Sequence, residues 1–469
     1  MTVWHFGAKR IVADQRNIYG PALVRRLLLF CAGALLAGCT VGPQYRSPTV
    51  DLSDSYSLLV PVGALSEDQA RWWLPFDDPV LNRLIELSLS ENLSLAEARQ
   101  RIKEAAAIAR RDGVLYRPGI DTTYRSVLDG GGESLTIGAS LGLDLFGQRR
   151  RQAEASLARL QAAEFDAENA QLLLLSQLTL AYVDLRFNQE SILLRQKDLR
   201  SRRQTLRDIS TLVERGAATR LDQLRARSLV AETEAQLPRL IAQGARQRNR
   251  IATLLGRSPG ALGIDIAYMG HQPQPDGKAA LGVPADLVRR RPDIRQAERL
   301  YAAAIAEIGV AEAARYPSLS LSGQILAPVS GGAETTTLSA GLALPLFEQN
   351  ALIAQVDASQ ARASQAYLQW RLAVLLAVEE VENALAAISG SRQGVTASRK
   401  VVVINEETLR LSRRLLDTSG EITVLDLLDR ERSVSDARGR LAQSLRDYAA
   451  DYIALNVALG LGISVMGGE

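Results

Sequence analysis

Four short segments of this 469-residue sequence alternate between apolar residues and small or polar residues, the pattern of a β-strand with two unlike faces. We predict strands at 119–128, 134–145, 318–327 and 335–344. The clearest run has an apolar residue at every second position, namely Leu135, Ile137, Ala139, Leu141, Leu143 and Leu145. This pattern fits a half-buried sheet of a soluble domain, and it equally fits strands that cross a bilayer.

The number of strands constrains the membrane interpretation. Four strands cannot close a barrel, and a lipid environment does not tolerate open sheet edges. Several copies of the chain would therefore have to contribute strands to one barrel, and three copies would supply about twelve strands.

Two very long helices are expected beside these strands. Residues 148–212 contain no proline and no glycine, and 348–417 is interrupted only around Gly390 and Gly394. A helix of 65 residues is about 100 Å long, so it needs an apolar stripe packed against neighbours. A coiled-coil rod would explain the helices but not the strands inserted at matching places.

The same order of features occurs twice, at an offset of about 200 residues. The matched landmarks are Arg117-Pro118 with Tyr316-Pro317, Leu145-Phe146 with Leu346-Phe347, Leu221-Asp222 with Leu425-Asp426, and Leu255-Gly256 with Leu459-Gly460. Each half reads as helix, two strands, a very long helix, a turn and a helix. We therefore predict a first repeat at 71–267, a Pro- and Gly-rich linker at 268–284, a second repeat at 285–463 and a tail at 464–469.

The N-terminus carries the features of a bacterial lipoprotein leader. A basic pair precedes an apolar run of 27–37, which is too short to span a bilayer but fits a signal peptide. The run ends in Leu-Ala-Gly-Cys, so the leader is predicted at 1–38, followed by a lipid-anchored extension at 39–70. The Cys39 thiol is the expected nucleophile for a diacylglyceryl group. Several acyl chains, including palmitate, would anchor the chain stably.

Composition argues against an enzyme and against nucleic-acid binding. The histidines are His5 and His271, and the cysteines are Cys31 and Cys39, which is too few for a zinc cage. The sequence contains no phosphate-binding GxxxxGK[ST] loop. The net charge of +3 becomes −1 without the leader, which holds five basic groups and one acid. We expect no catalytic site, no metal site and no cofactor other than the lipid on Cys39.

The order of motifs resembles the TolC-like outer-membrane factors, in particular the NodT-like lipoprotein channels of RND-type efflux systems. The motifs are Cys39–Tyr45, Trp72-Trp73 with Phe76, Asp78-Pro79 and Leu81, Arg290–Ile294 with Ala297-Glu298, and Tyr316–Leu319. The resemblance covers nearly all of the chain after the leader. It implies a mainly α fold with transmembrane β-strands, assembled as a homotrimer with a twelve-stranded barrel that continues into a periplasmic α-barrel.

The resemblance also implies a function. Such a channel is the outer-membrane exit duct of a tripartite multidrug efflux pump, and its partners are a periplasmic adaptor protein and an inner-membrane RND pump. Two alternatives remain open: a channel for type I protein secretion or metal-ion efflux, and a coiled-coil lipoprotein scaffold without a pore. Only three methionines occur, which disfavours a relay for soft metals.

By the same resemblance, the periplasmic aperture is formed by a small set of residues near the start of the last helix of each repeat. They are Asp222, Leu425, Asp426, Asp429 and Arg432. Three copies of each carboxylate around an axis would repel one another and hold water or cations, which should raise the carboxylate pKa values. The alternative is an ordinary acid in a first helical turn, paired with Arg432. Asp417 and Ile422 stand where some members have a Tyr and an Arg that tie neighbouring coils together.

Overall fold

The computed structural model describes most of the chain after the leader. The described residues are 40–53, 55–56, 71–114, 118–126, 133–266, 270–276, 287, 289–329, 331–418 and 422–462. The predicted leader, Cys39 and the tail at 464–469 lie outside them. Residues 57–70 of the predicted extension and most of the linker also lie outside them. The predicted division of the chain into these segments therefore stays a prediction.

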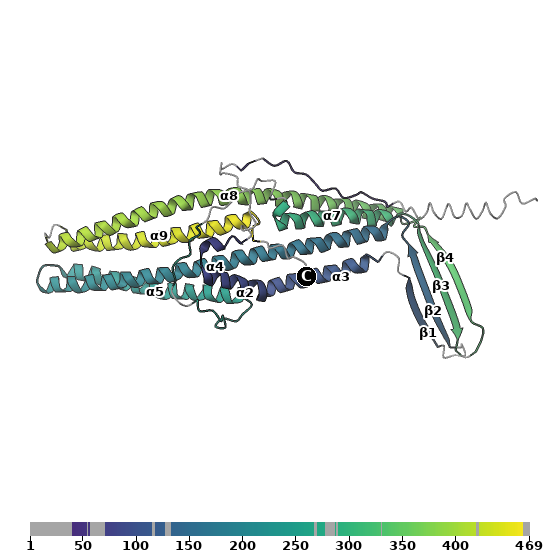
Figure 1. Cartoon of the computed structure of the whole chain (residues 1–469), viewed down its shortest axis with the longest axis horizontal. Helices are drawn as coiled ribbons and strands as arrows, with labels where there is room; N and C mark the ends of the chain where they lie inside the picture. The colour runs from purple at the N-terminus through teal and green to yellow at the C-terminus, as the bar shows by residue number, and fades with distance from the viewer. Residues whose placement is uncertain are drawn as a thin grey trace, which may run out of the picture. The chain divides into compact units, whose positions relative to one another are not determined.

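The two halves of the chain share the order helix, two strands, very long helix and shorter helix, and the first half has additional helical elements at its start (Figure 1). The first half contains η2 (Leu74–Phe76), α2 (Pro79–Glu91), α3 (Leu93–Asp112), β1 (Gly119–Arg125), β2 (Ser134–Leu143), α4 (Gln148–Glu214) and α5 (Arg220–Leu254). The second half contains α7 (Pro292–Ala313), β3 (Ser318–Pro328), β4 (Thr335–Ala343), α8 (Gln349–Thr418) and α9 (Val424–Ala458). The expected pseudo-repeat of helices and a two-stranded hairpin is confirmed.

The long helices α4 and α8 contain 67 and 70 residues. Each is therefore about 100 Å long at 1.5 Å per residue. The expected interruption near Gly390 and Gly394 is absent, because α8 continues through both glycines. A glycine costs about 1 kcal/mol relative to alanine in a helix, a penalty that the remaining residues of such a long helix outweigh.

The chain folds into two compact units, and each unit takes segments from both halves. The sheet unit comprises residues up to 45, 110–155 and 305–361, and the helical unit comprises 46–109, 156–304 and 362 onward. The repeats therefore share both units. They do not form one domain each.

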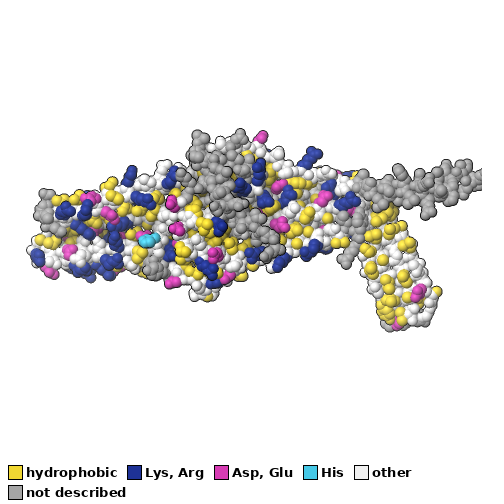
Figure 2. Space-filling view, viewed as in Figure 1, with side chains coloured by type: hydrophobic (Ala, Val, Ile, Leu, Met, Phe, Trp, Pro, Cys, Tyr) yellow, Lys and Arg dark blue, Asp and Glu magenta, His cyan; other side chains and the backbone are white. Residues whose placement is uncertain are grey.

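The sheet unit contains an antiparallel sheet with the order β1-β2-β3-β4, so that one hairpin from each half meets at the β2–β3 pair. The register pairs Leu141 with Leu321 and Ile137 with Ile325 on one face, and Ser140 with Ser322 on the other. Figure 2 shows hydrophobic side chains dominating the visible surface of these strands. Every residue of β1 and β4 is exposed. Each of these outer strands pairs with one strand of this sheet, so each presents an open edge.

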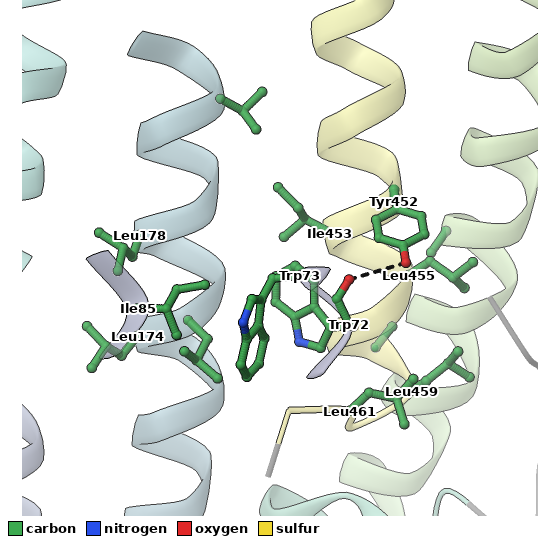
Figure 3. Close-up of a cluster of buried hydrophobic side chains, with 14 of the residues drawn as sticks. Trp72, Trp73, Ile85, Leu174, Leu178, Tyr452, Ile453, Leu455, Leu459 and Leu461 are labelled. Carbon is green, nitrogen blue, oxygen red and sulfur yellow. Dashed lines mark hydrogen bonds between the residues drawn. The ribbon is translucent and has the colours of Figure 1, made fainter. Parts of the chain in front are cut away.

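The core of the helical unit forms where the chain enters it. Trp72, Trp73 and Phe76 pack among side chains of three helices, which include Ile85 from α2, Leu174 and Leu178 from α4, and Tyr452 and Ile453 from α9 (Figure 3). The Tyr452 hydroxyl donates to the Trp72 carbonyl at 3.2 Å. These contacts join the first helices of one repeat to the last helix of the other.

One aspartate organises the entry into this core. The Asp78 carboxylate caps α2 by accepting from the Val80 and Leu81 amides at 2.9 and 3.1 Å, and it also accepts from the Tyr182 hydroxyl at 2.6 Å. Burial and the Asp78 charge raise the pKa of Tyr182 well above its ordinary value.

Within the described parts of the chain, no helix combines the length and the apolar character needed to cross a bilayer.

Candidate functional site at the helix turns

The predicted aperture residue Asp222 lies in the first turn of α5 and forms a reciprocal cap with Thr219. The Thr219 side chain accepts from the Asp222 amide at 3.2 Å. The Asp222 carboxylate accepts from the Thr219 amide at 3.1 Å and from its hydroxyl at 2.6 Å. This capping box satisfies backbone donors that a helix start otherwise leaves unpaired.

Asp426 has the same arrangement at the start of α9. Its carboxylate accepts from the Thr423 amide at 2.9 Å and from the Thr423 hydroxyl at 2.7 Å, while the Thr423 side chain accepts from the Asp426 amide at 3.2 Å. The two caps therefore share both sequence pattern and geometry, with threonine at the cap and Leu-Asp two and three residues later.

The capping bonds stabilise both carboxylates in the ionised form. Hydrogen bonds from the Thr219 hydroxyl and amide lower the pKa of Asp222, and those from Thr423 lower the pKa of Asp426. The nearby cations Arg225 and Arg430 act in the same direction. Within one chain, the pKa values of both aspartates are therefore lowered, whereas repulsion between the carboxylates of several copies was expected to raise them. The expected rise concerns several assembled copies and stays a prediction.

The remaining aperture residues share one face of α9. Leu425, Asp426, Asp429 and Arg432 are exposed, whereas Val424, Leu427, Leu428 and Glu431 on the opposite face are buried. The Asp429 carboxylate lies 3.9 Å from Arg430, which is a closer partner than the suggested Arg432. An exposed surface with two carboxylates and two arginines therefore runs along the first turns of α9.

The two capped turns are neighbours. Their buried sides pack into one small core formed by Ile209 of α4, Ala226 and Leu229 of α5, and Val424 and Leu428 of α9. Figure 1 accordingly places the α4–α5 and α8–α9 connections at the same end of the helices. The structure thus brings Asp222 and the α9 residues to one end of the helical unit.

A buried carboxylate that the sequence patterns did not predict lies behind this surface. Glu431 is 5% exposed. Its Oε1 atom accepts from the Thr205 hydroxyl of α4 at 2.7 Å and from the Arg413 guanidinium of α8 at 2.7 Å. Arg413 also donates to Ser201 of α4 at 2.8 Å. One carboxylate therefore connects three long helices close to the turns.

A signal for this residue exists in the sequence. Glu431 falls at the helical spacing of Leu427, Leu428 and Val434, and a lone acid within an apolar stripe indicates a buried partner. One turn further on, Ser435 donates to the buried Asp198 carboxylate at 2.6 Å and accepts from Arg195 at 2.7 Å. Polar bonds thus continue the contact between α4 and α9.

Ile422 is half-buried beside the cap, and the Asp417 side chain lies outside the described residues.

We predict that Thr423→Ala destabilises the start of α9 by about 1 kcal/mol at pH 7, because it removes a helix cap. The folded-state pKa of Asp426 is lowered, so its stabilisation is present above the unfolded pKa and is lost as pH falls through the folded pKa. The difference in thermal midpoint between wild type and variant should therefore shrink below about pH 4. Thr396→Ala, an exposed site within α8, is the control and should have little effect. Equal midpoints at pH 7 would refute the cap.

We also predict that Glu431→Gln lowers stability by roughly 1–3 kcal/mol, because it weakens hydrogen bonds to a charged, buried group. Hydrogen exchange should accelerate at the start of α9 and in the facing segment of α4. The matched control is Asp436→Asn, which changes an exposed carboxylate on the same helix. Wild-type exchange in the Glu431 variant would show that the connection contributes nothing.

Comparison with known proteins identifies the family. The model of the family described as "Outer membrane efflux protein" matches residues 84–257 and 283–461, one segment in each half. The chain is 36% identical to Nodulation protein T of Rhizobium leguminosarum bv. trifolii, over 91% of this chain and 95% of that protein. It is 29% identical to the pyoverdine export outer membrane protein OpmQ of Pseudomonas putida, over 94% and 98% of the two chains.

The fold is shared with a solved channel. The outer-membrane channel OprN superposes with a TM-score of 0.81 at 30% identity, over 90% of this chain and 99% of the other. This match confirms the TolC-like fold and excludes the scaffold without a pore. The chain belongs to the outer membrane efflux protein family, and it is an outer-membrane efflux channel, a transport protein and not an enzyme.

Proposed function

We propose that three copies of this chain form the exit duct of a tripartite efflux pump, in which a periplasmic adaptor and an inner-membrane RND pump deliver drugs or other small molecules. The observation that carries the proposal is the four-stranded sheet, whose outer strands β1 and β4 are exposed along their whole length. Three such sheets joined edge to edge supply twelve strands and leave no edge open to lipid.

The surface of α8 supports packing between copies. Leu368, Leu372 and Leu375 are 59%, 55% and 53% exposed at spacings of four and three residues. Ile404, Leu411 and Leu415 continue the pattern further along the helix, with exposures of 64%, 44% and 38%. An exposed apolar stripe of this period is typical of a helix that packs into a coiled coil, and a second copy supplies the missing partner.

The name of one relative supports the proposed cargo class. OpmQ is named for export of pyoverdine, and we propose a cargo other than a protein for this channel as well. Protein secretion and metal-ion efflux remain the alternative cargoes. The sequence has three methionines and two histidines, so few residues could form a relay of ligands for soft metal ions.

The membrane anchor is proposed to be a covalent lipid on Cys39. Multiple acyl chains at that residue would hold the start of the mature chain in the outer membrane. The proposed aperture is the exposed face of α9 with Asp426, Asp429, Leu425 and Arg432, together with Asp222 of α5. In a trimer these carboxylates form rings that attract cations and repel one another.

Purified protein in detergent should have the mass of three chains plus lipid, and it should open discrete, cation-preferring channels in planar bilayers. Native mass spectrometry and single-channel recording measure both properties. A monomer that is electrically silent would contradict the proposal. A gene neighbourhood with an adaptor and an RND pump would support the tripartite assembly, whereas a type I secretion ATPase beside the gene would favour the alternative.

For the aperture, we predict that Asp426→Ala combined with Asp429→Ala raises conductance and reduces block by divalent cations, because it removes two carboxylate rings. The control combines Glu97→Ala with Glu232→Ala, which neutralises two exposed carboxylates on α3 and α5. Conductance and block like those of wild type in the aspartate variant would remove these residues from the aperture.

A further inference from the structure

The first residues after Cys39 are held firmly against the sheet unit. The buried Arg151 guanidinium of α4 donates to the Val41 carbonyl at 3.2 Å and to the Gly42 carbonyl at 3.0 Å. The Val41 amide donates to the Phe146 carbonyl at 3.2 Å. Three hydrogen bonds thus fix three consecutive peptide groups near the point where the described chain begins.

Glycines permit this close approach. A Cβ atom at Gly42, which has φ +88°, would lie 2.5 Å from the Cα atom of Gly309 in α7. A Cβ atom at Gly309 would lie within 2.7–2.9 Å of the Arg151 side chain. Residues 40–42, Arg151 and Gly309 therefore interlock, and we call this set the N-terminal clamp.

A pocket opens beside the clamp, and its lining includes the polar side chains of Asp144, Gln148 and Glu348 as well as apolar ones. It has a volume of about 420 Å³ and is lined by residues that follow the ends of β2 and β4 and by residues before β3, among them Leu145, Phe146, Tyr316, Leu346 and Phe347. Phe146 and Tyr316 stack with ring centroids 4.6 Å apart. Leu346 is 68% exposed and Phe347 is fully exposed, so the pocket lacks a covering group on that side.

The clamp brings the lipid attachment point to this pocket. Thr40 lies against Gly147, since a Cβ atom at Gly147 would be 3.0 Å from the Thr40 Cα atom. Gly147 is the residue after Phe146, and Cys39 is one peptide unit, about 3.8 Å, from Thr40. Thr40, the residue that follows Cys39, therefore lies beside the segment that lines the pocket.

We propose that this pocket binds an acyl chain of the lipid on Cys39, and that the N-terminal clamp delivers the chain to it. The ligand is a long saturated hydrocarbon chain, which covers exposed apolar side chains that would otherwise contact water at the membrane surface. The anchor then becomes a packed part of the sheet unit. Arg151 acts as a positioning residue. This inference rests on the proposed lipidation of Cys39.

The test places benzoylphenylalanine, a photo-crosslinking residue, at position 347 of the full-length protein in outer membranes. After irradiation and trypsin digestion, the expected product joins the segment around 347 to the lipidated peptide Cys39–Arg46. Arg151→Met and Gly42→Ala should each reduce this product several-fold because they break the clamp. Arg149→Met is the control, as an exposed arginine in the same helical turn, and should leave the product unchanged.

The same photo-crosslinker at position 338 reports on bulk lipid, because Leu338 of β4 is 85% exposed. If position 338 labels free phospholipid while position 347 labels free phospholipid, a second copy of the chain or nothing, the pocket assignment is overturned. If mass spectrometry shows Cys39 without lipid, the anchor itself fails. If position 338 labels no lipid, the membrane-spanning role of the sheet fails. Each of these failures is therefore distinguishable.

Discussion

An exposed strand edge is a row of amide and carbonyl groups, and a lipid environment offers these groups no partner. This constraint governs the sheet unit. Its four strands pair fully with one another from β1 to β4, and the pairing of β2 with β3 joins hairpins that lie about 180 residues apart in the chain. The outer strands expose both faces along their length. The proposed trimer closes these edges with strands from other copies.

In the helical unit, unpaired backbone groups occur at the turns between helices. Each long helix must reverse direction, and each reversal exposes the unpaired backbone donors of the following helix. The same Thr-x-Leu-Asp pattern satisfies those donors in both halves, and it leaves a leucine and a carboxylate on the exposed side. Stability and the proposed aperture therefore use the same aspartates. Behind them, Glu431 connects α4, α8 and α9, so a change at one turn can be transmitted to the neighbouring helices.

The start of the mature chain is integrated into this architecture. Arg151 is almost completely buried. Its guanidinium group donates hydrogen bonds to the backbone carbonyls of residues 41 and 42 and to the Glu154 carboxylate. A buried arginine requires such partners because an unpaired buried charge is very costly. The segment next to Cys39 thus contributes to the folding of the sheet unit, which is more than a flexible tether to a lipid would do.

Local signals in the amino-acid sequence were enough to predict the strands, one long helix and the repeat. Alternation located the four strands, the absence of proline predicted the long helix α4, and the repeated landmarks revealed two equivalent halves. The sequence also indicated where Asp222 and Asp426 stand at helix starts, because capping depends on residues three apart. The folded structure was needed to show that both halves share each unit, that Glu431 contacts Arg413 and Thr205, and that Arg151 binds the carbonyls of residues 41 and 42. Those contacts join residues 18 to 226 positions apart, and no periodicity within one segment encodes which distant side chain completes a buried polar group.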